Sequence, residues 1–137
     1  MTKFKDEFVW GTAASSYQIE GGVKDNGRGD SVWDMFCRQP GWVRDSSDGR
    51  TACDHFNRYQ EDVNMMSDLG IQAYRLSMAW TRILPQGKGQ INQQGLDYYD
   101  RVVDALLEKG IDPWITLFHW DFPTGHPGLP KWTSRTS

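Results

Sequence analysis

The sequence has little cysteine, no long hydrophobic run and no excess of basic charge. Its 137 residues include only two cysteines, Cys37 and Cys53, which are too few for the disulfide framework of a small secreted domain. No apolar stretch approaches the roughly 20 residues that a membrane-spanning helix needs. Residues 1–10 lack the apolar core of a secretory signal. We therefore expect a reduced, cytoplasmic protein without a membrane segment.

The charge balance excludes a second class of function. The formal net charge is -3, and lysines and arginines are scattered rather than clustered. Proteins that bind nucleic acid through its phosphates need a basic patch or stripe, so we expect no nucleic-acid partner. The hydrophobic content of 38 % and the charged content of 24 % are ordinary for one folded domain of this length.

Aromatic residues are abundant. Seven tryptophans, five tyrosines and six phenylalanines make up 13 % of the chain. Large aromatic rings can fill a hydrophobic core, and they can also line a cleft for ligands with apolar faces, including sugars. Both interpretations remain open at the level of the sequence.

Hydrophobic periodicity predicts two amphipathic helices. The first lies in residues 52–70, where one helical stripe is formed by Phe56, Tyr59, Val63 and Met66. The second lies in residues 93–110, with its stripe at Leu96, Tyr99, Val103 and Leu106. Gly70 and Gly110 follow the two helices in the position typical of a helix C-terminus. A shorter helix, residues 32–38, begins after Ser31, a favourable N-cap.

Three strands are predicted between these helices, at residues 8–13, 71–78 and 111–120, and residues 81–92 are predicted as a loop. Each long helix meets the next strand at the same Gly-Ile junction, which indicates a repeated αβ unit. Alternating helices and strands joined by short turns are typical of an α/β fold with a parallel sheet. We expect the residues from Trp114 to Phe118 to form a strand buried on both faces.

Three polar residues fall at or near the carboxyl ends of these strands. Arg75 interrupts the second strand, His119 follows the third, and Gln18 lies just past the first. Parallel α/β folds bind their ligands at these ends, and a barrel directs inward positions there into a cavity. Alternatively, Arg75 forms a core ion pair and Gln18 caps a loop. A metal site of His119, Asp121 and His126 is disfavoured by irregular spacing.

Several long motifs then identify a family. The segments "FVWGTAASSYQIEGG", "DGRTACDHFNRYQEDVNMMSDLGIQAYRLSMAW" and "TLFHWDFP" together resemble the amino-terminal portion of glycoside hydrolase family 1, the β-glucosidase family. The resemblance covers residues 4 to about 123. It implies that residues 1–137 are the amino-terminal part of a single (β/α)8 TIM-barrel domain. This part comprises roughly the first three βα units and is an incomplete barrel.

The resemblance also implies roles for individual residues. Gln18 and His119 match family residues that hydrogen-bond hydroxyl groups of the sugar that is cleaved, and Trp120 matches a neighbouring residue of that pocket. Arg75 matches the arginine that lies against the nucleophilic carboxylate. The family hydrolyses β-glycosides with retention of configuration, and the reaction requires neither a metal nor another cofactor.

The carboxyl groups of that reaction are missing from the sequence. The family uses one glutamate in an Asn-Glu-Pro motif and one in a Thr/Ser-Glu-Asn-Gly motif, and neither motif occurs here. The only glutamates are Glu7, Glu20, Glu61 and Glu108. Residues from about 124 to 137 depart from the family pattern. We therefore expect a truncated chain that is inactive alone, with no catalytic residue of its own.

Two further expectations follow from an incomplete barrel. Strands at the open edges of its sheet favour self-association. The alternative function is that of a non-catalytic fragment, which binds a sugar or docks on a full-length homologue.

Overall fold

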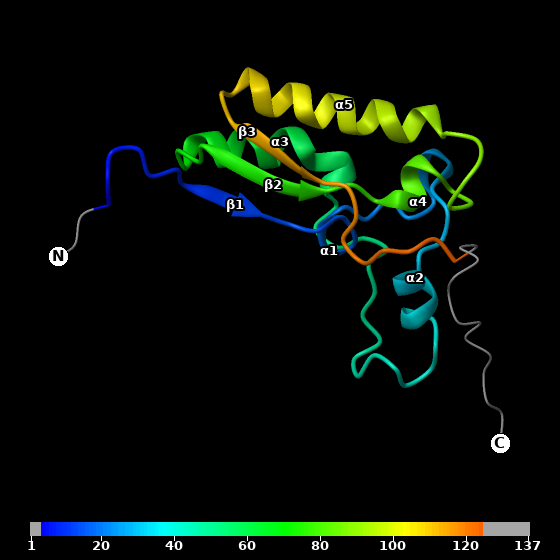
Figure 1. Cartoon of the computed structure of the whole chain (residues 1–137). Coiled ribbons are helices and arrows are strands. Elements are labelled where there is room, and N and C mark those ends of the chain that lie inside the picture. The colour runs from blue at the N-terminus through cyan, green and yellow to red at the C-terminus, as the bar shows by residue number, and fades with distance from the viewer. Residues whose placement is uncertain (1–3, 125–137) are drawn as a thin grey trace.

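The computed structural model describes residues 4–124, and a three-stranded parallel sheet lies at its centre (Figure 1). The strands, in the spatial order β1-β2-β3, are β1 (Gly11–Ala13), β2 (Ala73–Ser77) and β3 (Asp112–Thr116). Both neighbouring pairs are parallel. The α/β fold with a parallel sheet that the sequence predicts is therefore confirmed.

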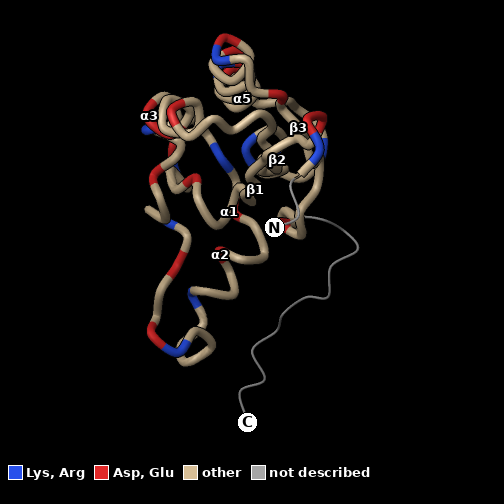
Figure 2. The backbone as a smooth tube through the Cα atoms, turned by 90° about the vertical axis from the view of Figure 1, so that its left-hand side faces the viewer, with Lys and Arg blue, Asp and Glu red and all other residues tan. Residues whose placement is uncertain are grey.

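Two long helices connect the strands and cover one face of the sheet. They are α3 (His55–Asp68), which precedes β2, and α5 (Gln93–Glu108), which precedes β3. Figures 1 and 2, which differ by a quarter turn, both show α3 and α5 on the same side of the strands. The remaining short helices are α1 (Ser16–Ile19), the 3-10 helix η1 (Asp25–Gly27), α2 (Val32–Cys37) and α4 (Trp80–Ile83).

The two Gly-Ile junctions end both long helices in the same way. Gly70 and Gly110 adopt positive φ values of 71° and 70°, which cost glycine little. The amide of Ile71 donates to the Met66 carbonyl at 3.0 Å, and the amide of Ile111 donates to the Leu106 carbonyl at 2.9 Å. This is the Schellman pattern, in which a hydrophobic residue after the glycine packs back on the last turn. Both predicted helix ends are confirmed.

The hydrophobic core lies between the sheet and these helices. Tyr74 and Leu76 of β2 point into it, and α3 and α5 supply most of the rest. The fully or largely buried residues of the cluster are Val63, Met66, Tyr74, Leu76, Tyr98, Tyr99, Val102, Ala105, Leu106 and Ile111. Since alternate residues of a strand face opposite sides, Arg75 and Ser77 point to the sheet face that α3 and α5 do not cover.

The N-terminus of α2 confirms the cap predicted at Ser31. The Asp34 amide donates to the Ser31 hydroxyl oxygen, and the Ser31 amide donates to the Asp34 carboxylate at 2.7 Å. This reciprocal arrangement is a capping box. Arg28 forms a buried ion pair with the same carboxylate at 3.0 Å. Together these contacts fix α2 to the loop that precedes it.

Three predictions about local structure were wrong. Residues 81–92 were predicted as a loop, but residues 81–83 belong to the short helix α4. Thr81 and Arg82 are buried there although they are polar, so the helix has no apolar pattern that the sequence could show. On α5, Tyr99 and Leu106 are buried as predicted, but Val102 is fully buried whereas Val103 is only partly so, which turns the buried face toward Val102. The third error concerns β3, which is not buried on both faces.

The exposure of β3 is pronounced. Trp114 is 63 % exposed and Leu117 is 77 % exposed. Trp114 is paired with Arg75 in the sheet and so lies on the face that α3 and α5 do not cover, and Leu117 lies just beyond the last residue of β3. The apolar run correctly predicted a strand, but it wrongly predicted that both faces of this strand are buried.

Figure 2 shows acidic and basic segments interspersed along the backbone, without a stretch of one sign. Within residues 4–124, none of the helices combines the length and the apolar character that crossing a membrane requires.

Candidate functional site

Arg75 and His119 meet at the carboxyl end of the sheet. Arg75 lies in the middle of β2, opposite Ala13 of β1 and Trp114 of β3. Its Nη1 atom lies 3.1 Å from Nδ1 of His119, which follows β3. Both side chains are half-buried. The structure therefore brings together two of the four residues predicted for the site.

This contact determines which nitrogen of His119 carries the proton. A guanidinium group has five N–H donors and no acceptor. Nδ1 of His119 must therefore be the acceptor, and in the neutral ring the proton lies on Nε2. The Nε2–H group can then donate to an external oxygen, such as a hydroxyl group of a ligand. Arg75 thus prepares His119 as a hydrogen-bond donor.

Gln18 lies on α1, just beyond β1, and is exposed. Its side-chain oxygen accepts a hydrogen bond from the Ser15 hydroxyl at 2.8 Å. This contact supports part of the alternative prediction, a loop-capping role, and it leaves the amide nitrogen able to donate to a ligand. Among residues 4–124, no hydrogen bond joins Gln18 to Arg75 or His119.

Trp120 occupies an unusual backbone conformation. Its φ angle is 73°, in the left-handed region that bulky residues rarely adopt. The side chain is 72 % exposed. The following residue, Asp121, is only 1 % exposed. The chain therefore turns sharply here, and two neighbouring residues end in opposite environments, one against solvent and one inside the protein.

Asp121 was considered in the sequence only as a member of a disfavoured metal set, but the structure places it in a buried network. Its Oδ2 atom accepts from the Ser16 hydroxyl at 3.3 Å, and the Ser16 amide donates to the Ser77 hydroxyl oxygen at 2.8 Å. Only one signal in the sequence pointed to Asp121, which was a carboxylate placed directly after a buried strand. Its partners lie far away in the sequence and could not be found by spacing.

A second buried network involves Glu20. Its Oε1 atom accepts from the Tyr99 hydroxyl at 2.7 Å, and its Oε2 atom accepts from Arg82 Nε at 3.1 Å. Burial, followed by the nearby Glu20 carboxylate, raises the pKa of Tyr99 well above its ordinary value. Arg82 also donates to the carbonyls of Gly21 and Gly22. Glu20 therefore holds the glycine loop in place and is closed to solvent.

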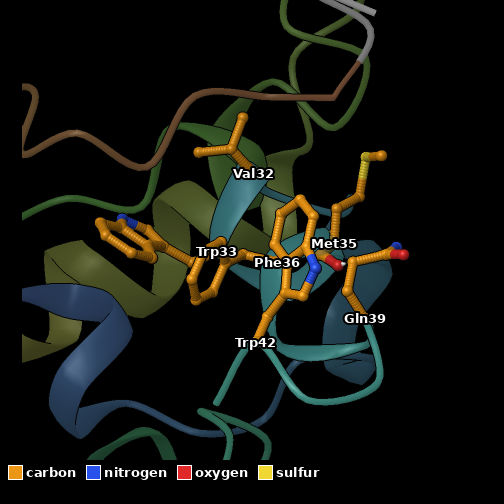
Figure 3. Close-up of a pocket in the computed structure, with 6 residues that line it drawn as sticks. All are labelled: Val32, Trp33, Met35, Phe36, Gln39 and Trp42. Carbon is orange, nitrogen blue, oxygen red and sulfur yellow. Dashed lines mark hydrogen bonds between the residues drawn. The ribbon is translucent and has the colours of Figure 1, made fainter. Parts of the chain in front are cut away.

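The aromatic residues divide between the two interpretations left open by the sequence. Tyr98 and Tyr99 belong to the core. Trp33 and Trp42 line an apolar pocket of about 240 Å³ on α2 and the loop after it, together with Val32, Met35, Phe36 and Gln39. Figure 3 shows these six side chains around the pocket. The lining of this pocket does not include Arg75, His119 or Trp120.

No metal centre is formed in the part of the chain that the structure describes, since no three histidine, cysteine or acidic side chains gather there. His126, the third member of the disfavoured metal set, lies outside the described residues. So do residues 125–137 of the segment predicted to depart from the family pattern.

Parallel strands with polar side chains at or near their carboxyl ends are typical of α/β folds, both open sheets and barrels. The sequence profile of Glycosyl hydrolase family 1 matches residues 1–137. The chain belongs to this family.

Individual relatives agree with the profile. The chain is 48 % identical to β-glucosidase A of Thermotoga maritima over 133 residues, which cover 97 % of this chain and 30 % of that protein. It is 50 % identical to coniferin β-glucosidase of Pinus contorta over 120 residues, or 88 % of this chain and 23 % of the relative. The chain thus spans about 30 % or less of the length of these relatives.

The solved structure of the family 1 β-glucosidase from Thermotoga maritima superposes with a TM-score of 0.88 at 50 % sequence identity. The match covers 91 % of this chain and 29 % of that chain. The same enzyme has been solved in complex with deoxynojirimycin. The predicted fold is therefore confirmed: this chain forms a partial parallel sheet with its helices, an incomplete TIM barrel.

Proposed function

We propose that this chain forms the sugar-binding wall of a β-glucosidase-type retaining glycoside hydrolase. The Arg75–His119 hydrogen bond carries the proposal, because it makes Nδ1 the acceptor and leaves the Nε2–H group of the neutral ring able to donate to a sugar hydroxyl. Gln18 adds an exposed amide, and Trp120 adds an exposed aromatic face, which suits the apolar face of a sugar ring. In this role Arg75 also supports the nucleophilic carboxylate by keeping it ionised.

The hydrolytic step needs carboxyl groups from elsewhere. Retaining glycosidases use two carboxyl groups about 5 to 5.5 Å apart. Glu20 is buried and bonded to Arg82, whereas Glu7 and Glu61 form exposed ion pairs with Lys5 and Arg58. Glu108 is the last residue of α5 and is exposed. We therefore expect no turnover of an aryl β-glucoside by the 137-residue chain alone.

A chimera tests the function directly. Residues 1–124 of this chain replace the matching segment of β-glucosidase A of Thermotoga maritima, which supplies the rest of its barrel. We expect the chimera to hydrolyse an aryl β-glucoside, and His119→Ala to reduce kcat/KM by about 100-fold, as expected for loss of a contact that positions substrate.

Exposed Leu69→Ala on the far end of α3 is the matched control and should leave kcat/KM unchanged. A folded chimera that neither hydrolyses the glucoside nor binds deoxynojirimycin would refute the proposal. Folding is checked by circular dichroism and by the thermal unfolding midpoint.

The exposed outer side of the sheet supports two further proposals. We propose that the 137-residue polypeptide self-associates, because β1 and β3 are edge strands within the described residues and exposed aromatic side chains lie at both, Trp10 just before β1 and Trp114 on β3. The alternative function, docking on a full-length homologue, would use the same surface. Sedimentation velocity over a range of concentrations separates a monomer from an assembly.

Two variants locate the surface that associates. Leu117→Lys places a charge beside β3, where Leu117 is 77 % exposed. Leu69→Lys places the same charge after α3, where Leu69 is 71 % exposed. We expect only Leu117→Lys to favour the monomer. A wild-type chain that stays monomeric at every concentration would contradict self-association, and co-purification with a longer homologue would favour docking.

A cytoplasmic location remains part of the proposal. It is supported by the two cysteines, both of which are free thiols in the structure. Fractionation of cells that express the chain tests it.

A further inference from the structure

Three buried side chains link the three strand-end segments to one another. The Ser16 amide donates to the Ser77 hydroxyl oxygen at 2.8 Å, and the Ser77 hydroxyl donates to the Ser16 hydroxyl oxygen at 3.2 Å. The Ser16 hydroxyl in turn donates to Asp121 Oδ2 at 3.3 Å. Each of the three residues is at most 3 % exposed. This Ser16–Ser77–Asp121 network is therefore shielded from solvent.

Each member of the network lies two residues from a residue of the proposed site. The pairs are Ser16 with Gln18, Ser77 with Arg75, and Asp121 with His119. On β2 this spacing has a direct consequence, because alternate residues of a strand share a face. Ser77 therefore lies on the same face as Arg75 and one step closer to the carboxyl end of the sheet. A shift of the network would move all three segments.

The turn at Trp120 needs such a support. A left-handed conformation is strained for a bulky residue and persists only where the surrounding structure holds it. The residue after it, Asp121, is drawn inside the protein, and its carboxylate accepts a hydrogen bond from Ser16 of α1. Its other oxygen, Oδ1, is buried without a partner within residues 4–124. Ser16 is thus the sole side-chain donor to this carboxylate in that part of the chain.

We propose that Asp121 is a positioning residue for sugar binding. Its buried carboxylate, held by Ser16, keeps the chain turned at Trp120 and sets the distance between α1 and the end of β3. Through this anchor, the exposed ring of Trp120 and the Nε2–H of His119 face the sugar. The role toward the sugar rests on the proposed function, whereas the anchoring of the turn does not.

Two pairs of variants test the anchor in the 137-residue chain. Asp121→Asn keeps an oxygen acceptor for Ser16, whereas Asp121→Leu keeps the branched shape and removes the acceptor. Ser16→Ala removes the hydroxyl and retains the backbone bond to Ser77. Ser31→Ala is the matched control, since Ser31 is an equally buried serine bonded to a buried aspartate, Asp34, at 2.8 Å, and its bridge to Pro123 is made by the backbone and is retained.

The first readout is the nitrogen NMR spectrum of the chain, in which the histidine and tryptophan side chains carry a nitrogen isotope label. The chain has only three histidines, so His119 is assigned by its loss in His119→Gln. Magic-angle spinning of the sedimented protein reads the same signal from a monomer and from an assembly. We expect Ser16→Ala and Asp121→Leu to shift the His119 ring and Trp120 indole signals, Asp121→Asn to shift them less, and Ser31→Ala to leave them unchanged.

The second readout is binding of deoxynojirimycin, followed by the same signals during a titration. Ser16→Ala should weaken binding about fivefold, the loss expected for one hydrogen bond. Asp121→Leu should weaken it more than Asp121→Asn does. Thermal unfolding midpoints accompany each variant, so that a general loss of stability, which Ser31→Ala will also show, is separated from a local effect.

Two results would overturn the anchor. One is an unchanged pair of His119 and Trp120 signals in both Ser16→Ala and Asp121→Leu. The other is equal behaviour of Asp121→Asn and Asp121→Leu, because the acceptor would then be irrelevant. If the wild-type chain alone does not bind deoxynojirimycin, binding is measured in the chimera, where its absence together with the absence of hydrolysis refutes the proposed function, and the signals of the variants still decide whether Asp121 anchors the turn.

Discussion

Nη1 of Arg75 lies 3.1 Å from Nδ1 of His119, and this contact joins the middle of β2 to the segment after β3. Because a guanidinium can only donate, the contact fixes the imidazole as the Nε2–H tautomer. A basic side chain in a strand thereby acquires a defined task, which is to donate a hydrogen bond to His119 Nδ1.

The first prediction concerns this contact. Arg75→Lys keeps the positive charge but loses the planar fork that reaches His119. We expect the free energy of unfolding to fall by about 1 kcal/mol, the usual value of one hydrogen bond, and the His119 nitrogen signals to lose the pattern of a single tautomer. Urea unfolding and histidine-selective NMR measure the two effects. A His119 spectrum identical to that of the wild type would mean that Arg75 does not control the tautomer.

The second prediction concerns Arg82. Its guanidinium is fully buried, pairs with Glu20 and lies over the ring of Phe56 at 4.2 Å. Arg82→Met leaves the Glu20 carboxylate buried without its cation, so we expect a loss of about 3 to 5 kcal/mol in the free energy of unfolding. Such a loss could unfold a marginal domain. Denaturant unfolding and circular dichroism measure the change.

The same substitution at an exposed arginine is the control. Arg58 pairs with Glu61 on the outer surface of α3, where such pairs contribute less than about 1 kcal/mol. Arg58→Met should therefore leave the unfolding midpoint nearly unchanged. Comparable losses in the two variants would show that burial of the Arg82 pair is not what stabilises the loop.

The third prediction concerns two glycines. Gly95 lies in α5, where alanine is normally favoured, yet a Cβ atom there would lie 2.1 Å from the Arg82 carbonyl oxygen. Gly95→Ala should push α4 and α5 apart and destabilise the chain by about 1 to 3 kcal/mol, as overpacking does. At Gly110 a Cβ meets nothing within 4 Å, and only the positive φ of 70° opposes it.

Gly110→Ala should consequently cost about 1 to 2 kcal/mol, the penalty of a left-handed alanine. The two variants also differ in kind. Only Gly95→Ala should disturb the NMR signals of α4 and of the Glu20 network. If Gly95→Ala is more stable than the wild type, helix propensity outweighs the close approach of the two segments, and the packing described here is wrong.

The fourth prediction concerns alkaline pH. Burial, followed by the charges of Asp62 and Glu20, raises the pKa of Tyr74 from 10.0 to about 12, and burial raises the pKa of Tyr98 further. In the unfolded chain these phenols ionise near pH 10, whereas in the folded chain they keep their protons. Their contribution to stability is therefore complete below pH 10 and is lost as the pH rises through the folded-state pKa values.

We expect the unfolding midpoint to fall between pH 10 and pH 12 and to fall less steeply in Tyr74→Phe. An ultraviolet titration of the phenolates measures ionisation, and urea unfolding at each pH measures stability. A midpoint independent of pH over this range would indicate that these tyrosines are accessible to water.

Much of the fold could be predicted from local patterns. The steps of three and four along residues 52–70 and 93–110 specified two helices, and the matching Gly-Ile junctions specified where they end. These features depend on a few neighbouring residues, because a glycine with positive φ and the isoleucine after it, whose amide bonds to the last turn, are enough to end the helix. The residues of the proposed site were also visible, since Arg75 breaks an apolar strand and His119 follows one.

The tertiary structure decided what no local pattern contains. It paired Arg75 with His119 across 44 positions in the sequence and Ser16 with Asp121 across 105. It buried Arg82 and Glu20, which the sequence offered as ordinary loop residues, and it left Trp114 and Leu117 exposed although their strand reads as buried. The physical reason is the same throughout: periodicity tells which side of an element is apolar, but burial and hydrogen bonding depend on what the rest of the chain places against that side.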